Sequence, residues 1–116
     1  MKRKLPELLE LGGHTIRVSR TDNLLETQEA YGLFDPINLQ IEIDSSLTNT
    51  MAWETLWHEI VEAINFFSEA GMEHKSIQVF GLLLHQVANS MFTYKRTCKE
   101  DADDTTVPAK QEQKPV

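Results

Sequence analysis

The run from Met51 to Phe67 constrains the fold of this 116-residue chain more than any other segment. Its apolar residues recur at the three- and four-residue spacing of a helix. They form one wide face: Trp53, Leu56, Trp57, Ile60, Ala63, Ile64 and Phe67. A surface helix does not need this much apolar bulk, so the pattern predicts the central helix of a domain. Asn49 or Thr50 is expected to cap its start and Gly71 to stop it.

The polar side of the same run carries His58-Glu59-Ile60-Val61-Glu62. In a helix, residues 58 and 62 stand one turn apart on the same face, so their side chains can bind one metal ion together. Glu59 projects about 100° around the helix, where it can act as a base on a water bound to that ion. Glu54 lies one turn before His58 and is placed to orient its other ring nitrogen.

A catalytic zinc site uses three protein ligands and keeps one position open. His74 follows a short link that can fold back toward the motif, and His85 lies level with residues 58–62 if two helices pack as an antiparallel hairpin. Asn89 and Ser90 are weaker candidates. The spacing alone leaves both histidines open as the third ligand.

Strand patterns precede the central helix, and a second helix follows it. His14–Val18 alternates, as does Leu39–Asp44, and the latter is expected to form a hairpin with Ala30–Phe34 around the turn Asp35–Asn38. Thr21–Glu29 is predicted as a loop or a short helix. The second helix is expected from about His74 to Phe92, with an inner stripe made of Ile77, Phe80, Leu84, Val87 and Met91.

Composition and charge limit the classes of function that the chain can have. The net charge is −7, and no Lys or Arg occurs from Thr21 to His74, so a nucleic-acid partner is not expected, whereas a divalent cation would be attracted. The single Cys98 rules out an intrachain disulfide and suits the cytoplasm. A signal peptide is not expected, because the stretch that would have to be apolar is interrupted by Pro6, Glu7 and Glu10. No segment has the length of a membrane span. Residues 1–97 are expected to form a single domain and 98–116 a disordered acidic and polar tail.

The run Thr55–Asn65 resembles the active-site helix of small phage and prophage zinc-metallopeptidase-like proteins, which are similar to the ImmA/IrrE peptidases and to minimal gluzincins. The resemblance extends over about residues 11–92. It includes Leu11–Val18, Tyr31–Asp35, the Ile-Glu-Ile strand, Met72–Ile77 and Leu84–Val87.

This resemblance implies a zincin-like α+β fold, in which an antiparallel sheet of two or three strands packs on the motif helix and a second, C-terminal helix closes the site. It also implies zinc, with His58 and Glu62 as ligands and Glu59 as general base. The family pattern has histidine at the position of Glu62 and an acidic third ligand near the next helix. An exchange of ligand types, with glutamate at 62 and histidine at 74, keeps two histidines and one carboxylate, so the resemblance favours His74 over His85.

The resulting hypothesis is a zinc-dependent peptidase that acts on a peptide or protein. The alternative is a non-catalytic metal-binding or protein–protein interaction module with the same fold, in which Trp53, Trp57, Phe66 or Phe67 would supply an exposed patch. A lesser alternative, suggested by the acidic middle of the chain, is an inhibitor that mimics DNA.

Overall fold

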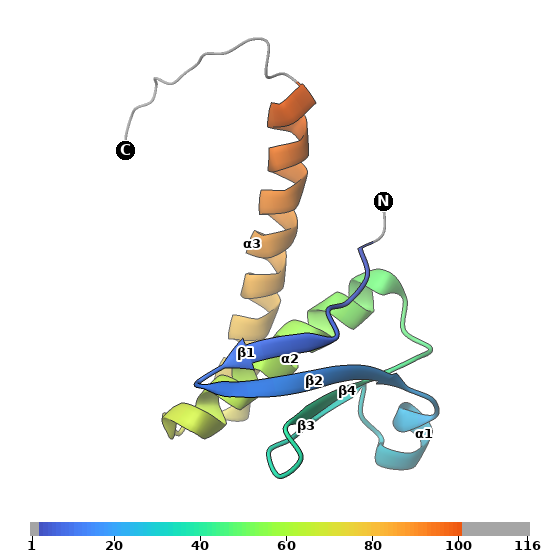
Figure 1. The fold of residues 1–116 in the computed structure, drawn as a ribbon, viewed down its shortest axis with the longest axis vertical. Coiled ribbons are helices and arrows are strands. Elements are labelled where there is room, and N and C mark those ends of the chain that lie inside the picture. Colours follow the sequence, from blue (N-terminus) through green and yellow to red (C-terminus); the bar gives the residue numbers. More distant parts are fainter. Residues whose placement is uncertain (1–2, 101–116) are drawn as a thin grey trace. The chain divides into compact units, whose positions relative to one another are not determined.

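The computed structural model describes residues 3–100, and side chains within residues 3–92. The fold is α+β. Its described elements follow in the order β1 (Leu8–Leu11), β2 (His14–Thr21), α1 (Leu24–Gln28), β3 (Gly32–Asp35), β4 (Gln40–Asp44), α2 (Asn49–Ser68) and α3 (His74–Glu100) (Figure 1). The chain divides into two compact units, Met1–His85 and Gln86–Val116. The sheet, α2 and the candidate site all belong to the first unit.

The sheet corrects two predictions, the number of its strands and their direction. It has four strands in the order β1-β2-β4-β3, and β2 pairs with β4 in parallel, whereas the other two pairings are antiparallel. The predicted hairpin of β3 and β4 is confirmed. Its turn is stabilised by the Asp35 carboxylate, which accepts hydrogen bonds from the backbone N–H groups of Ile37 and Asn38.

Strand β1 was not predicted, because Leu8–Leu11 does not alternate between apolar and polar residues. The signal that locates it is the following pair, Gly12-Gly13. Both glycines have positive φ angles, 60° and 82°, and a two-residue hairpin loop with positive φ at both positions matches the twist of the flanking strands. β1 therefore folds back on β2 as a tight antiparallel hairpin.

Asp44 ties α1 to the end of β4. It is 2% exposed, and its carboxylate accepts hydrogen bonds from the backbone N–H groups of Leu24 and Leu25 and from the Ser46 hydroxyl. These hydrogen bonds lower the pKa of Asp44 below its usual value, and the bond from Ser46 has the largest effect. The short helix α1 thus carries the chain from β2 to the outer strand β3 before β4 returns beside β2.

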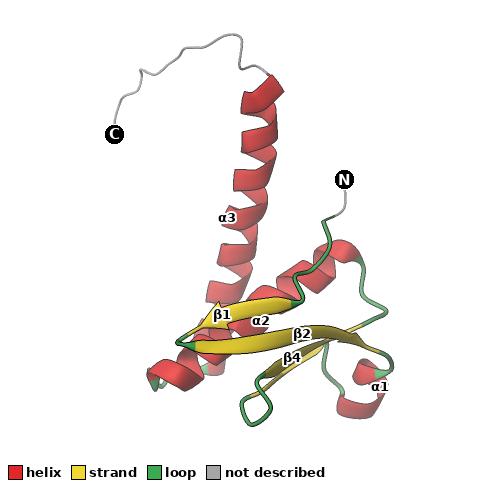
Figure 2. Cartoon of the chain, viewed as in Figure 1, coloured by secondary structure: helices red, strands yellow, loops and turns green. Residues whose placement is uncertain are grey.

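Helix α2 lies against one face of the sheet (Figure 2). The core between them contains Ile16, Val18, Ile41, Ile43, Ala52, Leu56 and Ala63. The predicted bounds of α2 need small corrections: Thr48 is the N-cap, with its side chain accepting a hydrogen bond from the Met51 N–H, and the C-cap is Glu69. Asn49 instead donates its side-chain N–H to the Arg3 carbonyl. The predicted central helix is otherwise confirmed.

Helix α3 starts at His74 as predicted but continues to Glu100. Of its predicted inner stripe only Ile77 is buried, whereas Phe80, Leu84, Val87 and Met91 are exposed. That part of the prediction is wrong. The predicted tail, 98–116, lies outside the described residues apart from its first three, which belong to α3. Among the described residues no helix combines the length and apolarity that crossing a membrane requires.

Candidate metal centre

The motif residues stand at the side of α2 rather than on a fully solvated face. Successive helical residues turn by about 100°, so Glu59 lies near the direction of the core residues Ala52 and Ala63, whereas His58 and Glu62 lie farther around the helix. Accordingly Glu59 is buried, and His58 and Glu62 are half-buried. One helix therefore presents two half-buried candidate ligand side chains and one buried acid to the same region.

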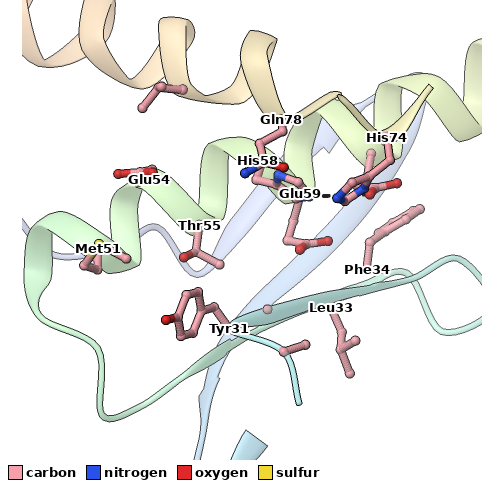
Figure 3. Close-up of a pocket in the computed structure, with 14 residues that line it drawn as sticks. Tyr31, Leu33, Phe34, Met51, Glu54, Thr55, His58, Glu59, His74 and Gln78 are labelled. Carbon is pink, nitrogen blue, oxygen red and sulfur yellow. Dashed lines mark ion pairs between the residues drawn. The ribbon is translucent and has the colours of Figure 1, made fainter. Parts of the chain in front are cut away.

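His58, Glu62 and His74 form a group whose candidate ligand atoms all lie within 4.8 Å of one another. His58 Nε2 is 3.5 Å from Glu62 Oε2, and the rings of His58 and His74 meet edge to face with their centroids 5.7 Å apart. Figure 3 shows His58 and His74 side by side above the strand that carries Phe34. Within the part of the chain that the structure describes, no other group of three His, Cys, Asp or Glu side chains comes together in this way.

The link between α2 and α3 brings His74 to the other two residues. Glu69 and Gly71 both have positive φ angles, 56° and 68°, which turn the chain sharply after α2. The Asn65 side chain then accepts a hydrogen bond of 2.8 Å from the Met72 N–H. Because this bond fixes the link to α2 two residues before His74, the first turn of α3 starts beside the motif.

Two glycines allow the backbones around the site to approach closely. A Cβ atom at Gly81 of α3 would lie 2.9 Å from the Cα of His58, and one at Gly32 of β3 would lie 2.6 Å from Thr55 Cγ2 and 3.3 Å from Glu59 Cγ. Real Cβ atoms essentially never come within 3.0 Å of another heavy atom, and both the 2.9 Å at Gly81 and the 2.6 Å at Gly32 are below this limit. Gly81 and Gly32 thus let α3 and β3 contact α2 on either side of the motif.

Glu59 is the most unusual residue of the site. It is 7% exposed, and its carboxylate makes no hydrogen bond and no ion pair with any described residue. Burial, together with the nearby Glu62 carboxylate, raises the pKa of Glu59 to about 7. Buried polar groups are nearly always paired, so an unpaired buried carboxylate makes Glu59 a candidate functional residue.

The raised pKa of Glu59 makes a prediction for the metal-free protein. The folded chain keeps the Glu59 proton up to about pH 7, whereas the unfolded chain loses it near 4.5. The unfolded state therefore binds fewer protons in this window, and stability falls as pH rises from 4.5 to 7. We expect Glu59→Gln to remove this fall. Relative to the wild type, the free energy of unfolding of the variant should therefore rise by roughly 3 kcal/mol as the pH increases from 4.5 to 7.

Urea unfolding with a chelator present, at several pH values across this window, measures the gain directly. Glu54→Gln makes the same substitution five residues earlier on α2 and serves as the matched control. A difference between Glu59→Gln and wild type that stays constant with pH would show that the Glu59 carboxylate is not desolvated in the folded protein.

The motif lines a cavity of about 590 Å³ between α2, the start of α3 and β3. Figure 3 shows Tyr31, Leu33 and Phe34 along one wall and Met51, Glu54 and Thr55 on the α2 side. Sequence reasoning did not identify Tyr31, Gly32, Thr55 or Gln78 as lining residues. For Gly32 a signal existed, since glycine inside a strand often marks a close backbone approach.

The other residues that the sequence suggested for this site do not join the group of His58, Glu62 and His74. His85, Asn89 and Ser90 do not line this cavity, and His85 does not join the group of His58, Glu62 and His74. Glu54 lines the cavity but makes no hydrogen bond to His58. The aromatic patch proposed for the interaction alternative is largely packed: Trp53, Trp57 and Phe67 are half-buried, and Phe66 is 53% exposed.

Comparison with known proteins adds no further assignment: neither the family models nor the curated proteins nor the solved structures contain a match to this chain.

Proposed function

We propose that this protein is a metal-dependent hydrolase that cleaves peptide bonds, with zinc held by His58, Glu62 and His74 and with Glu59 as general base. The observation that carries the proposal is the approach of three ligand side chains to one another beside a buried carboxylate without a partner, at the wall of a cavity. A solvated helix face would account for His58 and Glu62 but not for the burial of Glu59.

The residues present fit zinc. Two imidazole nitrogens and one carboxylate oxygen are a ligand set that catalytic zinc sites use. Zinc bonds of about 2.1 Å at tetrahedral angles place two ligand atoms about 3.4 Å apart, close to the 3.5 Å between His58 Nε2 and Glu62 Oε2. The candidate ligand atoms of all three residues are up to 4.8 Å apart, so the side chains must move closer to one another when zinc binds. When bound, zinc would supply a Lewis acid and make a coordinated water more acidic.

Glu59 has the position that a general base needs. It follows His58 directly in the chain, faces the cavity wall next to β3, and is not a member of the ligand group. A nearby cation favours the ionised form of a carboxylate, so the raised pKa of metal-free Glu59 would fall when the site is loaded. The ionised carboxylate would accept a proton from water and pass it to the leaving amine.

An extended peptide is the substrate class that the cavity suits best. β3 pairs only with β4 among the described strands, so its other edge is open, and Tyr31–Phe34 line the cavity beside Glu59. The backbone groups of an open strand edge can pair with a peptide in extended conformation. The resemblance of Thr55–Asn65 to the active-site helix of zincin-like peptidases supports the same class.

A direct test uses a mixed peptide library and mass spectrometry. We expect the zinc-loaded protein to cleave peptides, a chelator to stop cleavage, and added zinc to restore it. The control is His58→Ala, purified in the same way, which should show no cleavage. A protein that binds one zinc per chain yet cleaves no peptide would contradict the hydrolase and favour the non-catalytic metal-binding module.

A further inference from the structure

A second cavity, of about 650 Å³, lies between the segment 4–7, the second half of β2 and the start of α2. It shares no lining residue with the cavity of the candidate metal centre. The segment is attached on both sides of this cavity. The Arg3 carbonyl accepts a hydrogen bond of 2.9 Å from the Asn49 side chain at the start of α2 (Figure 1). The Glu7 carbonyl accepts one of 2.9 Å from the Val18 N–H of β2, so the wall between these two bonds has a fixed position.

The cavity gathers positive charge on a chain whose net charge is −7. Lys4, Arg17 and Arg20 line it, and they are three of the five Lys and Arg residues within 3–92. None of the three forms an ion pair with a carboxylate of a described residue. Glu7 is the only acid among the lining residues. Three cations and one carboxylate leave two positive charges without a counter-ion, and such a cavity attracts an anion.

Arg20 is held in place without being neutralised. One nitrogen of its guanidinium group, Nη2, donates hydrogen bonds to the backbone carbonyls of Asp44, Ser45 and Leu47. These acceptors carry no net charge, so the guanidinium keeps its full positive charge. Its other two nitrogens donate to no described residue, although both carry N–H groups. Because Arg20 lines the cavity, these N–H groups are available to the oxygens of an anion.

The charge and the composition of the lining together indicate the class of anion. A carboxylate carries one negative charge, whereas a phosphate group with one organic substituent carries about −1.5 to −2 at pH 7, which matches the two uncompensated positive charges. Arg and Lys are also the usual phosphate-binding residues. Leu5, Pro6 and Leu8 add apolar surface to the same cavity. Inorganic phosphate would leave this surface uncovered, whereas the organic part of a phosphate monoester would cover it.

We propose that this cavity binds a small phosphate monoester, with its phosphate group against Lys4, Arg17 and Arg20 and its organic part against Leu5, Pro6 and Leu8. The cavity volume of about 650 Å³ is in the range of small-molecule sites. The proposal does not depend on the candidate metal centre, so the hydrolase and the phosphate site can each fail while the other stands.

Isothermal titration calorimetry of the full chain with phenyl phosphate tests this proposal. The protein is first freed of metal, and the buffer contains no phosphate, so that zinc cannot bind the probe. We expect one phenyl phosphate per chain. Benzoate, which has the same ring and a single charge, should bind about tenfold more weakly or worse, because it loses at least one charged hydrogen bond. Inorganic phosphate should also bind about tenfold more weakly, because it lacks the apolar ring.

Variants of single cations locate the bound probe. Lys4→Gln and Arg17→Gln should each weaken phenyl phosphate binding by about tenfold. Lys75→Gln makes the same change as Lys4→Gln at an exposed residue of α3 that does not line the cavity, and it should leave the affinity unchanged. Circular dichroism of the three variants checks that they remain folded. Absence of saturable binding, equal affinity for benzoate or inorganic phosphate, or full affinity in both Lys4→Gln and Arg17→Gln would each overturn the proposal.

Discussion

His74→Ala is expected to weaken zinc binding by at least about a hundredfold, while His85→Ala leaves the affinity nearly unchanged. Loss of a partner that only supports a metal ligand already costs about ten- to a hundredfold in affinity, and loss of a ligand should cost more. His74 belongs to the group with His58 and Glu62, whereas His85 does not. Competition titration against a chromogenic zinc chelator measures both affinities.

His85 is a matched control because it is the same residue type on the same helix. The opposite ranking, with His85→Ala as the weaker binder, would mean that α3 takes a different position when zinc is bound. Equal affinities in both variants and the wild type would show that zinc binds elsewhere on the acidic chain.

Glu59→Gln is expected to lower the rate of peptide hydrolysis by about 10²–10⁴-fold and to leave zinc binding nearly intact. Glutamine has almost the same shape as glutamate but cannot accept the proton of water. Because Glu59 is not in the ligand group, the change leaves all three proposed ligands in place. Steady-state rates on a cleaved peptide, with zinc saturating, give the ratio.

Glu54→Gln is the control for the charge, since Glu54 also lines the cavity but lies one turn away from the motif. We expect its rate to stay within about tenfold of the wild-type rate, because it removes no ligand and no base. Full activity in Glu59→Gln would contradict the role of Glu59 as general base, whatever the state of the metal.

The sequence predicted those features whose cause is local. The alternation of Leu39–Asp44 and the turn at Asp35 located the β3–β4 hairpin, and the apolar spacing after Met51 located α2. The one-turn spacing of His58 and Glu62 likewise indicated that they lie together, and their atoms are 3.5 Å apart. Each of these inferences depends only on the period of a helix or a strand.

Features that depend on distant partners were not predictable in the same way. The helical period placed Glu59 about 100° from His58, but only the sheet decides that this direction is buried. The period of α3 predicted that Leu84 and Val87 face inward, but both are exposed, because a helical period does not show what packs against the helix. The parallel pairing of β2 and β4 joins segments far apart in the chain, with Arg17 beside Gln40, and no short pattern reveals such a pairing.

Zinc titration of the metal-free protein, followed by its melting temperature, tests the central claim most directly. The account predicts one zinc per chain. Zinc at about a hundred times its dissociation constant should stabilise the fold by about 2.7 kcal/mol, which raises the melting temperature of a domain of this size by about 10 °C or more. His58→Ala should bind no zinc and show no rise. Absence of bound zinc in the wild type, with an unchanged melting temperature at excess zinc, would contradict the account.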